Sequence, residues 1–184
     1  PSQEGLYQHF IAQAQASDLP LILYNVPGRT GVDLAVETIV RLAAHPNICG
    51  LKDASHDLLR VQHLSEQLDL REFALYSGED ISSLAFMRLG GIGAISVTAN
   101  VVPKAVAKMC QAALDGHWQK ATLIDRSIRH WHSSLFIEAS PGPAKWVLHR
   151  IGRLSQQTLR LPLVPPSAAA AEVLEAAIQS IETT

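Results

Sequence analysis

The stretch Leu21-Ile22-Leu23-Tyr24-Asn25-Val26-Pro27-Gly28 decides the fold class. Its first four residues form a short apolar run that follows Pro20 and precedes a segment rich in turn-forming residues. Such a pattern is typical of a buried strand that ends in a loop. A helix is expected before it, over residues 2–17, because the apolar residues there are spaced to share one helical face. The chain therefore opens with a helix and a buried strand.

The same alternation recurs three more times. Helices are expected over residues 34–44, 58–68 and 81–89, and strands follow them at residues 48–52, 73–76 and 93–97. Apolar strands separated by helices predict an α/β protein built from parallel βαβ units, with both faces of the sheet covered. A barrel and a doubly wound sheet both satisfy this pattern. After Asn100 only helices are expected, over residues 102–114, 118–136, 143–151 and 168–181.

The composition indicates a folded protein whose partners are small molecules or proteins. The chain has 184 residues, of which 47% are hydrophobic, and it carries 15 Lys+Arg against 17 Asp+Glu. That length can bury a sizeable core. Without a basic cluster, no nucleic acid and no anionic membrane surface is expected as a partner. The longest charge-free run, residues 89–103, is shorter than the about 20 apolar residues that cross a bilayer.

The two cysteines and the first residues bear on location and completeness. Cys49 and Cys110 lie far apart in apolar surroundings, which favours reduced thiols and a cytoplasmic location. The chain begins at Pro1 with neither a methionine nor a signal sequence and leads directly into the first expected helix. We therefore expect it to start inside a larger fold.

Lys52 is the strongest candidate for chemistry, because it ends an expected buried strand. On the two-residue period of a strand it shares a face with Ile48 and Gly50, and Gly50 leaves space beside the lysine side chain. Burial disfavours the ammonium form and lowers the pKa of a lysine, and the neutral amine can attack a carbonyl carbon to form a Schiff base. The alternatives are a lysine that extends to solvent and one that pairs with Asp53 at the strand tip.

Tyr24 and Arg29 lie at the end of the preceding strand and in the loop after it. In parallel α/β folds the loops at the carboxyl ends of the strands form the ligand site, so both residues are expected to face the same cavity as Lys52. A phenol can relay protons and a guanidinium can bind a carboxylate through two hydrogen bonds. Taken singly, Tyr24 could equally be a core aromatic residue and Arg29 an exposed loop charge.

Two further strand ends, residues 77–80 and 93–100, carry glycines beside polar side chains. Glycines there let the backbone approach a ligand closely, and backbone amides can hold a carboxylate. The alternative is that these are ordinary turn residues. The eight histidines are scattered, and His130 and His132 diverge in direction on an expected helix, so we expect no metal site.

Four segments together resemble the dihydrodipicolinate synthase family of the N-acetylneuraminate lyase superfamily. In order and spacing they are Tyr-Asn-Val-Pro-Gly-Arg-Thr-Gly at 24–31, Gly-Leu-Lys-Asp-Ala-Ser at 50–55, Ser-Gly-Glu-Asp at 77–80 and Gly-Ala-Ile-Ser-Val-Thr-Ala-Asn-Val at 93–101. Residues 138–145 and 158–162 resemble the C-terminal helical region of the same family.

The resemblance implies a TIM (β/α)8 barrel and class I aldolase chemistry without a cofactor. Pyruvate would condense with aspartate semialdehyde to 4-hydroxy-tetrahydrodipicolinate, in lysine and diaminopimelate biosynthesis. Lys52 would form the Schiff base with pyruvate, Tyr24 would relay protons, and Arg29 would hold the carboxylate of the semialdehyde. The substrate pockets would be lined by Gly78, Glu79, Ile95 and Asn100. The family usually has aspartate where this chain has Glu79.

The resemblance covers only part of the barrel, since it begins in the helix after the family's fourth strand. Residues 1–116 would then hold strands five to eight, and residues 117–184 a C-terminal helical domain. A complete barrel typically needs about 250 residues, so we expect the isolated fragment to be inactive or impaired. Two alternatives stay open: a related pyruvate-dependent lyase or aldolase acting on a sugar acid, and a non-catalytic truncated binding module. By resemblance, a homo-oligomer that is a dimer of dimers is expected.

Overall fold

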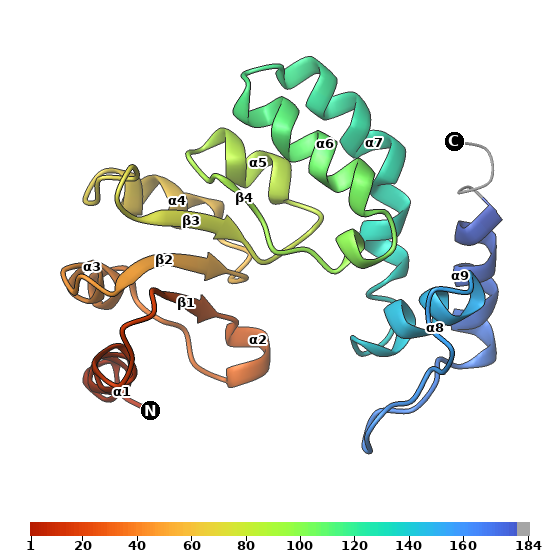
Figure 1. Ribbon diagram of the computed structural model, residues 1–184, viewed down its shortest axis with the longest axis horizontal. Helices are drawn as coiled ribbons and strands as arrows, with labels where there is room; N and C mark the ends of the chain where they lie inside the picture. The colour runs from red at the N-terminus through yellow and green to blue at the C-terminus, as the bar shows by residue number, and fades with distance from the viewer. Residues whose placement is uncertain (180–184) are drawn as a thin grey trace. The chain divides into compact units, whose positions relative to one another are not determined.

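The computed structural model describes residues 1–179, which divide by packing into two compact units (Figure 1). The first unit, Pro1–Ile95, alternates helices and strands, and the second begins at Ser96 and is helical. The sequence suggests a different division, after residue 116, between the barrel strands and a C-terminal helical domain. That division concerns the domains of a complete barrel, and it stays a prediction.

The first unit contains every helix and strand that the sequence predicts for it, and one short helix more. Its elements in chain order are α1 (Gln3–Gln15), β1 (Leu21–Asn25), α2 (Pro27–Thr30), α3 (Val36–Ala43), β2 (Ile48–Asp53), α4 (Leu58–Ser65), β3 (Ala74–Ser77), α5 (Ser83–Arg88) and β4 (Gly93–Ala94). The added helix, α2, begins at a proline and ends at Gly31 in the left-handed region, φ 71°.

The last strand is shorter than the predicted residues 93–97. Ile95 still donates its backbone N–H to the carbonyl oxygen of Ser77 at 2.9 Å, which continues the ladder by one bond. At Val97 the backbone is already helical, with φ −72° and ψ −41°, and a 3-10 turn follows. The local turn thus ends the strand before its apolar sequence ends.

The four strands form one parallel sheet in the order β1-β2-β3-β4. Each strand therefore lies next to its successor in the chain, as in a segment of a barrel. A doubly wound sheet reverses its strand order at a switch point, and these four strands show no reversal. The register aligns Tyr24 with Lys52 and Lys52 with Tyr76, so these three residues form one row across the sheet.

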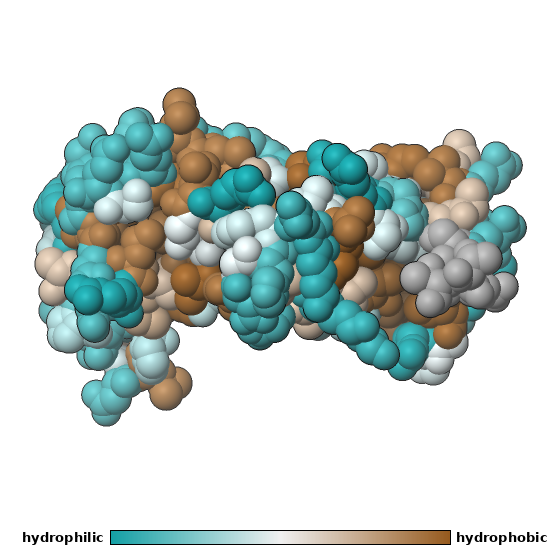
Figure 2. All heavy atoms as spheres, turned by 90° about the horizontal axis from the view of Figure 1, so that it is seen from above, coloured by the Kyte–Doolittle hydropathy of each residue, from teal (hydrophilic) through white to brown (hydrophobic). Residues whose placement is uncertain are grey.

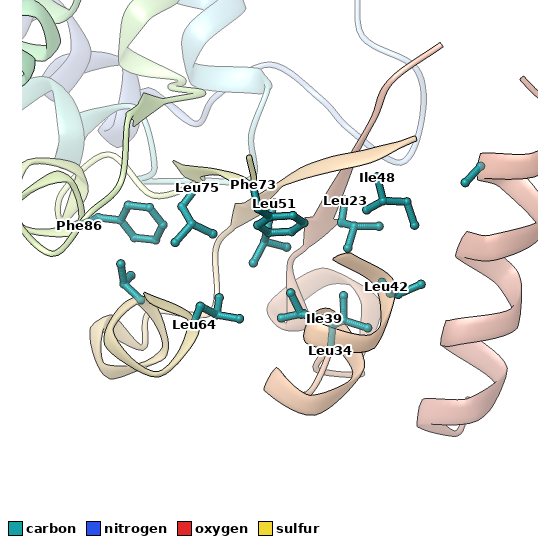
Figure 3. Close-up of a cluster of buried hydrophobic side chains, with 12 residues drawn as sticks. Leu23, Leu34, Ile39, Leu42, Ile48, Leu51, Leu64, Phe73, Leu75 and Phe86 are labelled. Atoms are coloured by element: carbon teal, nitrogen blue, oxygen red, sulfur yellow. The ribbon is translucent and has the colours of Figure 1, made fainter. Parts of the chain in front are cut away.

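One face of the sheet packs against helices and forms the core of the unit. Figure 3 shows Leu23, Leu51 and Leu75 on the strands, directed toward Ile39 on α3 and Leu64 on α4. All five side chains are at most 1% exposed. Burying such a side chain contributes roughly 1.5–3 kcal/mol, so this layer fixes both the helices and the strand register.

The other face of the sheet is open within this unit. Ile22 and Tyr24 on β1 are 40% and 44% exposed, although each alternates with a buried neighbour. The prediction that both faces are covered is therefore correct for the helix side only. Figure 2 shows apolar surface, in brown, between hydrophilic regions of the face that it displays.

The second unit consists of the 3-10 helix η1 (Thr98–Asn100), α6 (Pro103–Leu114), α7 (Trp118–Ser134), α8 (Gly142–Arg150) and α9 (Ala168–Gln179). These helices agree with the sequence prediction to within two residues at the described ends. Positions 180 and 181, which the sequence assigns to the last helix, lie outside the described residues. None of the helices up to residue 179 combines the length and apolar character that a bilayer span requires.

A buried chain of polar side chains joins η1 to α7. Thr98 Oγ1 lies 2.9 Å from His132 Nδ1, and His132 Nε2 lies 3.5 Å from Asp125 Oδ1. Arg129 Nη1 donates to Asp125 Oδ2 at 3.1 Å. Burial acts to raise the pKa of Asp125, but His132 and Arg129 outweigh it, so that the pKa lies below its usual value.

This lowered pKa predicts an acid-sensitive second unit. A carboxyl group whose pKa is lower in the folded state adds stability above its unfolded pKa and loses it as the pH falls through the folded pKa. We therefore expect the thermal midpoint to drop as the pH falls below about 4, and to drop less in Asp125→Asn. Circular dichroism melts at several pH values test this, with exposed Asp18→Asn as control. Equal acid sensitivity of wild type and Asp125→Asn would contradict the assignment.

Candidate active site

The carboxyl ends of β1 and β2 bring two predicted catalytic side chains into contact. Lys52 Nζ lies 3.9 Å from the centroid of the Tyr24 ring. Lys52 is half-buried and Tyr24 is 44% exposed, so both can be reached from the open face of the sheet. A cation over an aromatic face is attracted by the ring quadrupole, which holds the lysine beside the phenol.

Asp53 does not pair with Lys52. Consecutive strand residues project to opposite faces, so the Asp53 carboxylate lies on the helix side of the sheet. There it accepts hydrogen bonds from Asn25 Nδ2 at 2.8 Å and from Ser55 Oγ at 2.6 Å. Within residues 1–179 no carboxylate forms an ion pair with Lys52. The alternative of a lysine neutralised by its neighbour is therefore wrong.

Gly78 provides the space beside the lysine side chain. A Cβ atom at Gly78 would lie 3.1 Å from Lys52 Cε, 2.9 Å from Ala54 Cβ and 3.0 Å from the Asp53 carbonyl oxygen. Its backbone N–H donates to that same carbonyl at 2.7 Å. Sequence analysis gave this role to Gly50, but a Cβ at Gly50 would lie 2.6 Å from the Ala74 carbonyl oxygen. Gly50 therefore serves the close approach of β2 and β3.

Arg29 presents an unpaired guanidinium near the end of β1. It lies on the short helix α2, five residues after Tyr24, and its side chain is exposed. No carboxylate in the described part of the chain forms an ion pair with it. A free guanidinium at a strand end suits the binding of a carboxylate from solution.

Glu79 is held by two neighbouring side chains. Its Oε1 is in hydrogen-bonding contact with His56 Nδ1, and its Oε2 accepts a hydrogen bond from Ser82 Oγ at 2.5 Å. The Glu79 side chain is 19% exposed. Both carboxylate oxygens of this predicted substrate contact are thus already engaged within the protein.

The last two predicted site residues fall on either side of the division between the units. Ile95 ends the first unit, where it is 45% exposed. Asn100 belongs to the second unit, is exposed, and donates from Nδ2 to the Val97 carbonyl oxygen at 3.0 Å, which closes its own 3-10 turn. The first unit gathers Tyr24, Lys52 and Gly78 at one point.

Comparison with known proteins identifies this arrangement. The model of the dihydrodipicolinate synthetase family matches residues 1–181. The chain belongs to this family. Proteins named 4-hydroxy-tetrahydrodipicolinate synthase from Shigella dysenteriae serotype 1 and Escherichia coli O139:H28 are each 48% identical to it over 179 residues. These residues are 97% of this chain but 61% of each relative, so the chain spans about three fifths of their length.

Solved structures of the family carry the same fold. The chloride-inhibited dihydrodipicolinate synthase from Acinetobacter baumannii, complexed with pyruvate, superposes with a TM-score of 0.93 at 47% identity, covering 98% of this chain and 61% of that one. The synthase from Methylacidiphilum fumariolicum SolV gives 0.95 at 37% identity, covering 100% and 61%. The expected fold is confirmed: the parallel strands and the helices after them are part of the TIM barrel of this family.

Behind Lys52 lies a buried polar network that the sequence does not predict. Asn25 Nδ2 donates to Asp53 Oδ1 and to Asp33 Oδ1, both at 2.8 Å. Arg60 on α4 forms an ion pair with Asp33, donates to the Leu34 carbonyl oxygen at 2.6 Å, and places Nε 3.8 Å from Asp53 Oδ2. Burial raises the pKa of Asp53, against the hydrogen bonds from Ser55 and Asn25 and the charge of Arg60.

This network fixes the strand ends that carry the predicted catalytic pair. Asn25 follows Tyr24 and Asp53 follows Lys52, so each network residue is the chain neighbour of a site residue. Polar residues on the helix side of two otherwise apolar strands were the signal that could have revealed it. In the described range no three His, Cys, Asp or Glu side chains come close enough to hold a metal ion.

Proposed function

We propose that this chain is the C-terminal part of a Schiff-base-forming lyase that condenses pyruvate with aspartate semialdehyde. The observation that carries the proposal is Lys52 at the carboxyl end of β2, in contact with Tyr24 and with no carboxylate partner in residues 1–179. A lysine placed in this way can act as a nucleophile toward a carbonyl compound.

The proposed reaction begins when the Lys52 amine attacks the C2 carbonyl carbon of pyruvate. Loss of water from the carbinolamine leaves a protonated Schiff base, and removal of a C3 proton gives an enamine. The enamine carbon then attacks the aldehyde carbon of the second substrate. The amino group of that substrate next attacks the Schiff-base carbon and displaces the lysine nitrogen, which closes the ring and returns the free lysine. The Tyr24 phenol, next to Lys52, would carry protons to and from the carbinolamine oxygen and the new alkoxide.

Different observations support the assignment of the two substrates. Pyruvate is the compound bound in the Acinetobacter baumannii relative. For aspartate semialdehyde the support is the unpaired guanidinium of Arg29, which suits a second carboxylate, together with the name that the curated relatives share. A pyruvate-dependent lyase or aldolase acting on a sugar acid is the second candidate, and the acceptor assay below separates the two.

In this proposal, activity requires the complete barrel. The exposed Ile22 and Tyr24 on the open face of β1 suit a sheet whose inner face is closed by further strands. The outer strands β1 and β4 also have one unpaired edge each in the described sheet, and an unpaired edge is a site for added strands. The chain alone is expected to be inactive or impaired, or else a non-catalytic binding module, and a dimer of dimers is the proposed assembly.

An acceptor panel tests the proposed function. The chain is assayed both alone and joined behind the preceding part of the Escherichia coli relative, which supplies the missing barrel strands. With pyruvate as donor, turnover is measured with aspartate semialdehyde, with uncharged short aldehydes and with N-acetylmannosamine. We expect the joined protein to prefer the semialdehyde. A preference for the sugar would favour the second candidate, and no turnover with any acceptor would overturn the proposal.

Arg29→Ala is expected to raise KM for aspartate semialdehyde in the joined protein by roughly tenfold to a hundredfold, since a charged hydrogen bond contributes about 1.5–3 kcal/mol. Trapping of pyruvate with borohydride should stay within about twofold, because Arg29 is not assigned to the lysine step. Arg126→Ala, an exposed arginine on α7, is the matched control. If Arg29→Ala impaired pyruvate trapping as much as it impaired the reaction with the semialdehyde, the assignment of Arg29 to the semialdehyde carboxylate would be wrong.

A further inference from the structure

His56 has an unusual backbone conformation. Its φ is 65°, and within residues 1–179 it is the one non-glycine residue with positive φ. The left-handed region is uncommon for residues with a Cβ, and such strain persists only where the surrounding structure holds it. The turn containing His56 joins the end of β2, just after Lys52, to the start of α4.

The imidazole of His56 contacts the Glu79 carboxylate through Nδ1. The pair joins the turn after β2 to the turn after β3, and Ser82 Oγ holds the other carboxylate oxygen at 2.5 Å. The His56 side chain is 72% exposed while that of Glu79 is 19% exposed. The histidine is therefore the more exposed partner of this contact and the carboxylate the more buried one.

Glu79 is close in the chain to the groups around the lysine. It directly follows Gly78, whose backbone lies so near Lys52 that a Cβ there would approach Lys52 Cε to 3.1 Å. A carboxylate whose two oxygens are fixed offers its remaining lone pairs in set directions. It can then accept hydrogen bonds from a donor group of a ligand without first losing side-chain freedom.

We propose that His56 is a positioning residue that fixes Glu79 and thereby sets the affinity for the acceptor aldehyde, without a part in the lysine chemistry. The inference rests on the proposed function and adds to it a residue that determines specificity. Acceptors with a cationic or hydrogen-donating group, such as an amino aldehyde, are the class that a fixed carboxylate favours.

The test compares His56→Gly and His56→Asn with the wild type, all joined to the preceding barrel strands of the Escherichia coli relative. Glycine relieves the positive φ but removes the imidazole, whereas asparagine tolerates this φ and keeps a donor for Glu79. In His56→Gly, we expect KM for the semialdehyde to rise threefold to tenfold, with kcat and pyruvate trapping within twofold. His56→Asn should recover part of this loss. If His56 had only a structural role, His56→Gly would leave KM unchanged and would have equal or higher thermal stability than the wild type.

A double-mutant cycle with Glu79→Gln keeps the inference separate from the proposed function. Glu79→Gln should lower the thermal midpoint in the His56 protein and leave it nearly unchanged when combined with His56→Gly, because the contact between the two side chains is already gone. If the two substitutions lowered the thermal midpoint additively, or if His56→Gly left KM unchanged, the proposed role of His56 would be wrong. A wild type without turnover would instead overturn the proposed function, and the cycle on the midpoint would still decide whether His56 holds Glu79.

Discussion

Replacing Lys52 with arginine is expected to abolish covalent capture of pyruvate and to lower kcat of the joined protein by roughly a thousandfold or more. Arginine keeps a positive charge above the Tyr24 ring, which lies 3.9 Å from the amine in the wild type. It stays protonated at all accessible pH values and so cannot attack a carbonyl carbon. The substitution therefore removes the nucleophile and spares most of the local charge.

The measurement is a pair of assays on the same preparation: steady-state turnover, and intact mass after pyruvate and borohydride. Lys104→Arg, an exposed position on α6, is the matched control and should behave as the wild type. If Lys52→Arg kept turnover within tenfold of the wild type, the lysine would not be the nucleophile. Circular dichroism of the variant shows whether a loss arises from misfolding.

The second large effect is expected on stability, at Arg60. Its guanidinium is 7% exposed, pairs with Asp33 and lies 3.8 Å from Asp53 Oδ2. Asp33 is 47% exposed, but Asp53 is 4% exposed, so removing Arg60 leaves a buried carboxylate without its nearby positive charge. Arg60→Met should therefore lower the free energy of unfolding by about 3–5 kcal/mol. Chemical denaturation measures this change, with Arg71→Met as control because Arg71 and its partner Asp69 are exposed.

The pH dependence of that loss identifies its cause. Burial raises the pKa of Asp53, and the charge of Arg60 opposes the rise, so Arg60→Met should raise the pKa further. A carboxyl group with a raised folded pKa keeps its stabilising contribution below the unfolded pKa and loses it as the pH rises through the folded pKa. The destabilisation should therefore grow as the pH rises above about 4. A loss independent of pH would indicate lost packing alone.

The order of helices and strands could be predicted because each strand is an apolar run bounded by turn-forming residues. The position of Lys52 at a strand end, and its place on one face with Gly50, follow from the two-residue period. The parallel pairing and the row through Tyr24 and Lys52 follow from the βαβ pattern. Local sequence thus carries the fold and the central pair of the candidate site.

The contacts between the loops could not be predicted in this way. Three contacts depend on segments brought together by the sheet: Gly78 with Lys52, His56 with Glu79, and Arg60 with Asp53. The positive φ of His56 carries no sequence signal, since glycine or asparagine is the usual residue there. The short helix α2 was also missed, because its four residues are too few for a periodic pattern.

Borohydride trapping with pyruvate, followed by intact mass and peptide mapping, tests the central claim most directly. It is applied to the chain alone and to the chain joined behind the preceding part of the Escherichia coli relative. We expect a reduced pyruvate adduct on Lys52 in the joined protein, and none or a weak one in the chain alone. An adduct on another lysine, or none in either protein, would contradict the assignment of Lys52 and favour a non-catalytic binding module.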